Sequence, residues 1–332
     1  MLRRLCTFIA FCFLAANASA GTSDGLSAAK SDSACSAHVP GYTLQDYVRE
    51  CARLIDELKN IQNRCEDISA QPVSAQARRD PQLFCNEFNL SQLNIQLTAA
   101  LNDHAYFLIQ CKGSANYREA LKSLEGALGR GGESDKSVKS SRYGNENYWL
   151  AIRNKGVAHM LLNEHDKAAA AFGSLLTKLS EVKDSPNPND ARLGQVLVRP
   201  TSEADIRLGL GLALLGQCKL STSSDELFEA ERLTMGPILT EPALRAAALF
   251  GQGLVRKVKS AQYEHIAHNN SALTPSDRAR MQRHADQLAS EGKRQMDAAE
   301  TLVKGTAERI GAQYFIEERS LVTSCVAKPE TV

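Results

Sequence analysis

The segment from residue 147 to residue 179 constrains the fold of this chain more than any other part of it. Its apolar side chains recur every three or four residues, the spacing that places side chains on one face of an α-helix. They are Trp149, Ile152, Val157, Met160 and Leu161, followed by Ala168, Ala171, Phe172, Leu175 and Leu176. The pattern predicts two helices of about a dozen residues each, joined by a tight turn, and with them an all-α fold.

The composition agrees with a helical fold. Aromatic residues make up only 6% of the 332 residues, which favours stacked helices over a β-sandwich. The 39 basic and 38 acidic side chains nearly cancel. A balanced charge argues against nucleic acid or an anionic membrane as the main partner.

The first 20 residues have the pattern of a secretory signal peptide. Arg3 and Arg4 precede an apolar run from Leu5 to Ala16, and the small residues Ala18 and Ala20 precede the expected cleavage position, after Ala20. The run is shorter than the about 20 apolar residues that span a bilayer. We therefore expect residues 1–20 to be removed and the mature protein to be exported, to the periplasm or the extracellular space, without a membrane span. Residues 21–42 are expected to form a flexible tail.

Seven cysteines follow the signal segment, which points to disulfide bonds in an oxidising compartment. They are Cys35, Cys51, Cys65, Cys85, Cys111, Cys218 and Cys325. If one of the seven cysteines stays unpaired, there are seven choices for it and 15 ways to pair the other six. These choices give 105 arrangements, so the sequence does not determine the connectivity. The chain has no C-x-x-C motif, and a structural role is favoured over a metal or redox role.

A helical hairpin is expected over residues 43–100. Thr43 and Asp46 form a capping box that opens a helix to about Ser69, and a second helix is expected from about Leu83 to Cys111.

The cysteines of this hairpin have different possible partners. Cys51 and Cys65 are fourteen residues apart, about 21 Å along a helix, and cannot bond each other. Cys65 and Cys85 would both lie near the turn of the hairpin, which makes them the most plausible single pair. Cys51 could then reach Cys35 or Cys111.

Three residues of the segment 147–179 carry a resemblance to a known repeat family. Gly156, Ala168 and Phe172 have the offsets of the small, small and aromatic positions of a tetratricopeptide repeat. The two small residues let antiparallel helices approach closely, and Phe172 fills the gap towards the next pair. The chain therefore resembles a divergent tetratricopeptide-repeat protein, which implies a right-handed solenoid of antiparallel helix pairs.

The resemblance covers residues 101–267, with loop insertions expected near 129–147 and 184–203. In the first pair, Ala120, Leu124 and Ala127 are expected at the positions that Ala168, Phe172 and Leu175 take in the second. The spacing of the pairs is irregular, and an unrelated helical bundle is the alternative.

C-terminal capping helices are expected over residues 274–332. Thr274, Pro275 and Asp277 are typical of a helix start. Apolar and small residues from Ala285 to Tyr314 then recur at an average step near 3.6, which predicts a straight helix with a bend at Gly305.

The family resemblance implies a groove, lined by the first helix of each pair, that binds an extended or helical segment of a partner protein. The corresponding residues are Asn102, Ala105, Tyr106, Ile109, Leu150, Arg153, Asn154, Val157, Met160, Asp205, Leu208, Leu212, Arg245, Ala248, Gln252 and Val255. Arg153 and Arg245 could hold a carboxylate of the partner, although either could equally be an ordinary solvated arginine.

No catalytic motif is present, and neither a cofactor nor a metal is expected. Two other classes of function stay open. His265 and His268 have a spacing that can hold a metal ion, so a solute- or metal-binding protein is one alternative, although an exposed helix end explains them better. A helical hydrolase with scattered catalytic groups is the other. The leading hypothesis is an exported, disulfide-bonded helical scaffold that binds a protein or peptide partner.

Overall fold

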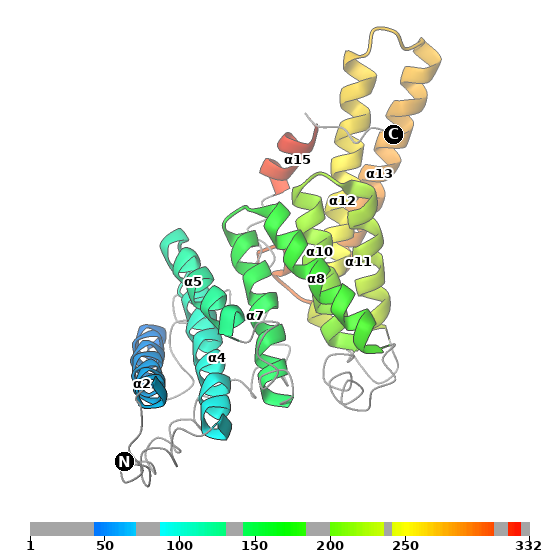
Figure 1. The fold of residues 1–332 in the computed structure, drawn as a ribbon. Helices are drawn as coiled ribbons and strands as arrows, with labels where there is room; N and C mark the ends of the chain where they lie inside the picture. Colours follow the sequence, from blue (N-terminus) through cyan, green and yellow to red (C-terminus); the bar gives the residue numbers. More distant parts are fainter. Residues whose placement is uncertain are drawn as a thin grey trace, which may run out of the picture. The chain divides into compact units, whose positions relative to one another are not determined.

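The computed structural model describes residues 43–70, 87–130, 142–183, 200–235, 241–308 and 318–326. The regular elements in these ranges are all α-helices, which confirms the predicted all-α fold (Figure 1). None of the described helices combines the length and the apolar character that crossing a membrane requires. The predicted signal peptide and tail lie outside the described residues.

The chain divides into two compact units between Ala158 and His159. The helices of the first unit are α2 (Leu44–Ala70), α4 (Glu87–Gln110), α5 (Ser114–Arg130) and most of α7 (Arg142–Leu161). Those of the second are α8 (His165–Lys183), α10 (Pro200–Gly216), α11 (Leu220–Thr234), α12 (Pro242–Asn269), α13 (Pro275–Leu302) and α15 (Glu318–Val326). The predicted repeat region, residues 101–267, thus contributes to both units.

In the first unit, α4 packs against both α2 and α5. The start of α2 is the predicted capping box. The backbone N–H of Thr43 donates to Asp46 Oδ2 at 2.8 Å, and the backbone N–H of Asp46 donates to Thr43 Oγ1 at 3.3 Å. These bonds satisfy N–H groups that a helix start otherwise leaves without a partner.

In the second unit, α12 is the central helix, because α10, α11, α13 and α15 all pack against it (Figure 1). Ten consecutive residues, from Ala246 to Val255, are buried. A helix that is buried all round is a core element rather than a surface element. The preceding helices pack in sequence, α8 on α10 and α10 on α11.

Three helix-to-helix turns each contain a residue with positive φ at the same position, although in the first turn the next residue, Gly113, also has a positive φ, of 101°. In each turn, the first helix ends two residues before a residue with positive φ, and the second helix begins two residues after it. These residues are Lys112, Asn163 and Cys218, with φ of 54°, 62° and 62°. The helix pair with its turn therefore repeats, with 51 residues between the first two turn residues and 55 between the last two.

The second and third turns also share their hydrogen bonds. The N–H of Cys218 donates to Leu215, and the N–H of Lys219 donates to Leu214. The corresponding residues around Asn163 make the same two bonds. This Schellman motif usually has glycine at the left-handed position, so asparagine and cysteine there conceal the repeat in the sequence.

The buried side chains of α5 have the predicted spacing. Ala120, Leu124 and Ala127 are all buried, as are Ala168, Phe172 and Leu175 on α8. The two sets differ in their distance from the turn, because Ala168 lies five residues after Asn163 and Ala120 lies eight residues after Lys112.

Glycines mark close approaches between the helices of the second unit. A Cβ atom on Gly209 would lie 2.6 Å from the ring of Phe172, so α10 carries a glycine where this ring of α8 packs. Phe172 therefore fills the space towards the next helix pair, as predicted. A Cβ atom on Gly211 would lie 2.7 Å from Leu227, at the contact between α10 and α11.

The α12–α13 hairpin is held together by small residues at intervals of seven. The three buried residues of α13 are Ala285, Gly292 and Ala299. On α12, the buried residues at this spacing are Ala246, Gly253, Ser260 and Ala267. A seven-residue interval is the spacing of a coiled-coil seam, whereas the sequence predicted a straight helix with a step near 3.6.

The last long helix also ends earlier than predicted. α13 stops at Leu302, and Gly305 follows with a φ of 77°. The carboxylate of Glu300 accepts hydrogen bonds from the N–H groups of Gly305 and Ala307. These bonds stabilise a break of the helix at Gly305, where the bend was predicted, and residues 306–308 are helical again. The helix start is as predicted, because Asp277 N–H donates to Thr274 Oγ1 at 3.1 Å.

The neighbouring helices extend into both predicted loop insertions. α5 continues to Arg130 and α7 begins at Arg142, within the predicted loop 129–147. α10 begins at Pro200, within the predicted loop 184–203. The rest of both insertions, 131–141 and 184–199, lies outside the described residues.

The disulfide bond that joins two described cysteines links Cys218 to Cys325, with their Cα atoms 5.2 Å apart. This bond lies in the C-terminal half of the chain and not in the predicted N-terminal hairpin. Cys65 is also disulfide-bonded, and Cys85, its predicted partner, lies outside the described residues. Cys35 lies outside them as well.

Candidate partner-binding surface

Most residues of the predicted groove are buried and therefore serve the core. The buried ones are Asn102, Ala105, Ile109, Asn154, Val157, Met160, Leu208, Leu212, Ala248, Gln252 and Val255. Five of the predicted residues keep exposed surface, namely Tyr106, Leu150, Arg153, Asp205 and Arg245. The prediction placed whole faces of the first helices in a groove, whereas neighbouring helices cover most of those faces. Of the predicted groove residues, only these five can therefore contact a partner unless the helices move.

In the first unit, α4 and α7 are joined by a hydrogen bond between two of the buried groove residues. The amide of Asn154 donates to Asn102 Oδ1 at 3.0 Å. Both side chains are buried, and each provides the partner that the other needs away from water. This hydrogen bond links α7 to α4.

Arg153, Leu150 and Tyr106 form the exposed part of the candidate surface in this unit. Leu150 precedes Arg153 by three residues on α7, so the two lie on neighbouring positions of one helix face. Leu150 is 43% exposed, which is unusual for a large apolar side chain. Burial raises the pKa of the Tyr106 phenol, and the nearby Arg153 guanidinium partly offsets this effect. Arg153 therefore lies within electrostatic reach of Tyr106.

In the second unit, the predicted carboxylate-binding role of Arg245 competes with an internal acid. Arg245 Nε lies 3.8 Å from Glu231 Oε1. The second oxygen of Glu231 accepts a hydrogen bond from Gln252 at 2.9 Å, and Gln252 in turn accepts one from Gln295 at 2.7 Å. The charge of Arg245 is therefore partly satisfied within the fold.

A cluster of charged groups also joins α8, α10 and α11. Glu203 accepts hydrogen bonds from Lys183 and from Arg207, and Arg207 also donates to Glu226 at 2.7 Å. Burial opposes ionisation of Glu203, but the two cations outweigh it and hold the pKa of this carboxyl below its usual value. These charges neutralise one another within the fold, so the cluster holds helices together.

One pair of side chains resembles the catalytic groups that the hydrolase alternative would need. His104 Nδ1 and Ser123 Oγ are hydrogen-bonded at 2.9 Å, the contact that a nucleophile and its base would make. Both side chains are more than nine-tenths buried. Burial also lowers the pKa of His104. A substrate could not reach this pair without opening the helices, so the pair is a buried link between α4 and α5.

The metal-binding alternative rests on two exposed histidines at the end of α12. His268 Nδ1 contacts the carbonyl oxygen of Glu264 at 2.8 Å, and His265 Nδ1 contacts Asn269 at 3.0 Å. Each ring thus has a partner on its own helix. Among the described residues, no three side chains of the metal-binding types come together.

Sequence reasoning missed two features of the surface. Phe228 on α11 and Met235, the residue directly after this helix, are 58% and 51% exposed. The sequence pattern placed Leu227 in the core but gave no signal for its neighbour Phe228. The other missed feature is the packing of α15 on α12, together with the Cys218–Cys325 pairing.

The chain was compared with known protein families, with curated proteins and with solved structures, and none of them matches it.

Proposed function

We propose that this protein is an exported helical-repeat scaffold that binds a protein partner through Leu150, Arg153 and Tyr106. The observation that carries this proposal is the exposed leucine one helical turn from an arginine on α7, next to a phenol of α4. An apolar anchor beside a cation and an aromatic ring is the composition of a protein-binding surface. The surface fits a peptide segment with one apolar side chain and one carboxylate.

Two further observations support a tetratricopeptide-like scaffold. The turns at Asn163 and Cys218 repeat the same positive φ and the same hydrogen bonds, and Lys112 has a positive φ at the corresponding position of the first turn. The buried residues of α8 and α11 also correspond at a separation of 55 residues, in the pairs Ala168 and Ser223, Phe172 and Leu227, Leu175 and Ala230, and Leu179 and Thr234. Repeated helix pairs of this kind present a fixed surface to a partner.

Export is proposed from the signal-like N-terminus and is supported by the Cys218–Cys325 disulfide. Such bonds persist in oxidising compartments and are rare in the cytosol. The first prediction is that protein recovered from the export compartment of its host begins after Ala20.

The binding proposal is tested by replacing Leu150 and Arg153 together with alanine and measuring recovery of the partner from the native host. Loss of a charge-assisted hydrogen bond costs about 1.5–3 kcal/mol, so binding should weaken by at least about tenfold. The melting temperature should not change, because both side chains are partly exposed. The matched control replaces Thr222 and Asp225 on α11, which are exposed in the second unit. Equal losses for the two variants would contradict the proposal.

A further inference from the structure

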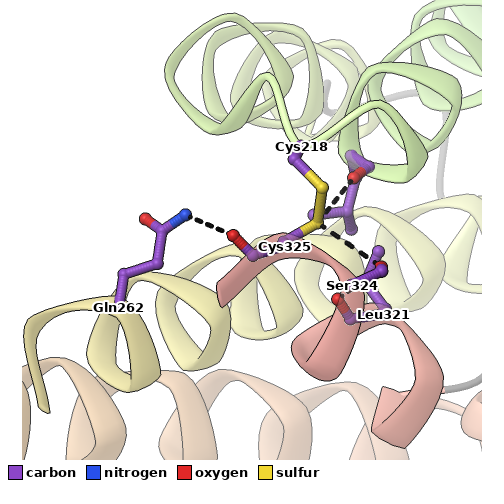
Figure 2. The surroundings of a disulfide bond; sticks show 6 residues. Cys218, Gln262, Leu321, Ser324 and Cys325 are labelled. Atoms are coloured by element: carbon purple, nitrogen blue, oxygen red, sulfur yellow. Dashed lines mark hydrogen bonds between the residues drawn. A yellow bond between two sulfur atoms is a disulfide. The ribbon is translucent and has the colours of Figure 1, made fainter. Parts of the chain in front are cut away.

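The C-terminal helix α15 lies on a surface formed by α12 and the end of α10 (Figure 2). Its two buried side chains, Leu321 and Cys325, are four residues apart and therefore on one helix face. Cys325 is bonded to Cys218, in the turn after α10. The surface in question, here called the α15 site, comprises Lys257 and Gln262 of α12 together with Leu215 and Cys218.

Gln262 acts as a cap for the end of α15. Its side-chain Nε2 donates to the backbone carbonyl oxygen of Cys325 at 3.0 Å (Figure 2). The last four carbonyl groups of a helix have no partner within that helix, and Cys325 is the last residue but one of α15. Gln262 is itself buried, so it would lose its acceptor if α15 left. The α15 site is thus equipped to bind a helix end.

The site also recognises charge at the other end of the helix. Lys257 forms an ion pair with Glu318, the first residue of α15. Gln262 comes five positions after Lys257 on α12, and Cys325 comes seven positions after Glu318 on α15. The ion pair and the hydrogen bond therefore occur in the same order along the two helices. A negative charge is favourable at a helix start. The site therefore selects a short helix with an acid at its start, an apolar residue one turn later and a small residue a further turn on.

Among the described residues, the non-covalent contacts of α15 include its packing on α12, the ion pair of Glu318, the hydrogen bond to Cys325 and the burial of Leu321. The helix has nine residues, fewer than the roughly 12–15 that an isolated helix needs in water. Leu321 is its one large buried side chain, and ordering nine residues opposes the gain from burying it. The covalent bond to Cys218 adds to these contacts.

We propose that α15 is an internal ligand of the α15 site, held by the Cys218–Cys325 disulfide, and that reduction makes this ligand exchangeable. A dithiol reductant would supply the two electrons. Both cysteines are buried, so a local opening of α15 first has to expose the bond. One thiolate of the reductant then attacks Cys218 Sγ, the S–S bond breaks, and Cys325 Sγ leaves as a thiolate that takes up a proton. The second thiol of the reductant then displaces Cys218, so that the reductant ends as a disulfide and the protein as two thiols. The site lies in the second unit and does not depend on the surface proposed around Leu150.

Hydrogen exchange on the full chain tests the release. In the oxidised protein, the amides of α15 should be protected. After treatment with a dithiol, they should exchange at least tenfold faster, while α12 and α13 keep their protection. Unchanged protection of α15 after complete reduction of Cys218 would overturn the proposal, because non-covalent contacts would then suffice to hold the helix.

Binding in trans tests the specificity of the site. The probe is a fluorescent peptide of residues 318–326 with the change Cys325→Ser, and the host is full-length protein with Leu321→Arg and Cys325→Ser, whose own helix cannot dock. The peptide should bind this variant and not the oxidised native protein. The further change Gln262→Leu should weaken binding by about tenfold or more. Reduced native protein serves as a second host if the variant does not fold. Equal binding of a scrambled peptide would overturn the proposal.

Discussion

The hydroxyl group of Ser223 donates a hydrogen bond to the backbone carbonyl oxygen of Gly211 at 2.8 Å, and both residues are buried. The bond joins α11 to α10 at a point where each helix carries a small residue. The residues 55 positions earlier are Ala168 and Gly156, the pair from which the repeat was predicted. The predicted reason for small residues, close approach of antiparallel helices, thus holds in the third pair.

Gly211→Ala is expected to destabilise the protein. The new Cβ would lie 2.7 Å from Leu227 Cγ and 3.3 Å from the backbone nitrogen of that residue, so a helix has to shift. Overpacking of this kind costs about 1–3 kcal/mol. The matched control is Gly173→Ala on α8, where a Cβ would meet no atom within 4 Å. This control should gain about 0.5–1 kcal/mol. Urea unfolding measures both, and a loss of equal size at Gly173 would refute the packing argument.

Gly292→Ala should loosen the α12–α13 hairpin. Its Cβ would lie 2.9 Å from the carbonyl oxygen of Gly253, a backbone atom that cannot turn away. Amide exchange in α13 is expected to accelerate, with little change in the first unit. The control on the same helix is Ser290→Ala, because Ser290 is exposed. If both variants exchange alike, the small-residue seam does not determine the stability of the hairpin.

Glu203→Gln should cost about 2–3 kcal/mol, because Lys183 and Arg207 lose the charge that both of them contact. Chemical denaturation measures the change in the free energy of unfolding. Glu181→Gln, at an exposed position of α8, is the control and should be nearly neutral. A neutral result at Glu203 would show that the charge cluster adds nothing to stability.

The protein should lose stability as the pH falls from about 7 to about 5. Burial lowers the pKa of both His165 and His104 below the ordinary value of 6.5. In this window the unfolded chain binds protons that the folded chain does not, so the free energy of unfolding decreases with falling pH. His165 Nδ1 is buried without a hydrogen-bond partner. His165→Phe removes one of these groups and should flatten the pH profile of the melting temperature, and an unchanged profile would contradict this account.

The sequence predicted the helices well where local signals are strong. The capping residues Thr43 and Thr274 marked two helix starts correctly, because a hydroxyl three residues before an aspartate satisfies backbone N–H groups in any context. The close approach at Phe172 was also foreseen, since an aromatic residue between small ones has to fill a gap.

Features that depend on the tertiary arrangement could not be predicted. Cys218 and Cys325 are 107 residues apart, and only the fold selects them from the many possible pairings. The burial of Met160 and Leu212 depends on which neighbouring helix covers them, which the period of one helix does not reveal. In the turn after α4, the residue that corresponds to Asn163 and Cys218 is Lys112 and not Gly113. The glycine in the sequence therefore did not reveal the position of the turn.

The most direct test of the proposed function is site-specific photo-crosslinking in the native host. A photoreactive phenylalanine analogue replaces Leu150 in one variant and Phe228, the other exposed large apolar position, in a second. The account predicts one dominant partner adduct at position 150, lost when Arg153→Ala is added, and no such adduct at position 228. No adduct at 150, or the same adducts at both positions, would contradict the claim that the α7 surface binds a partner.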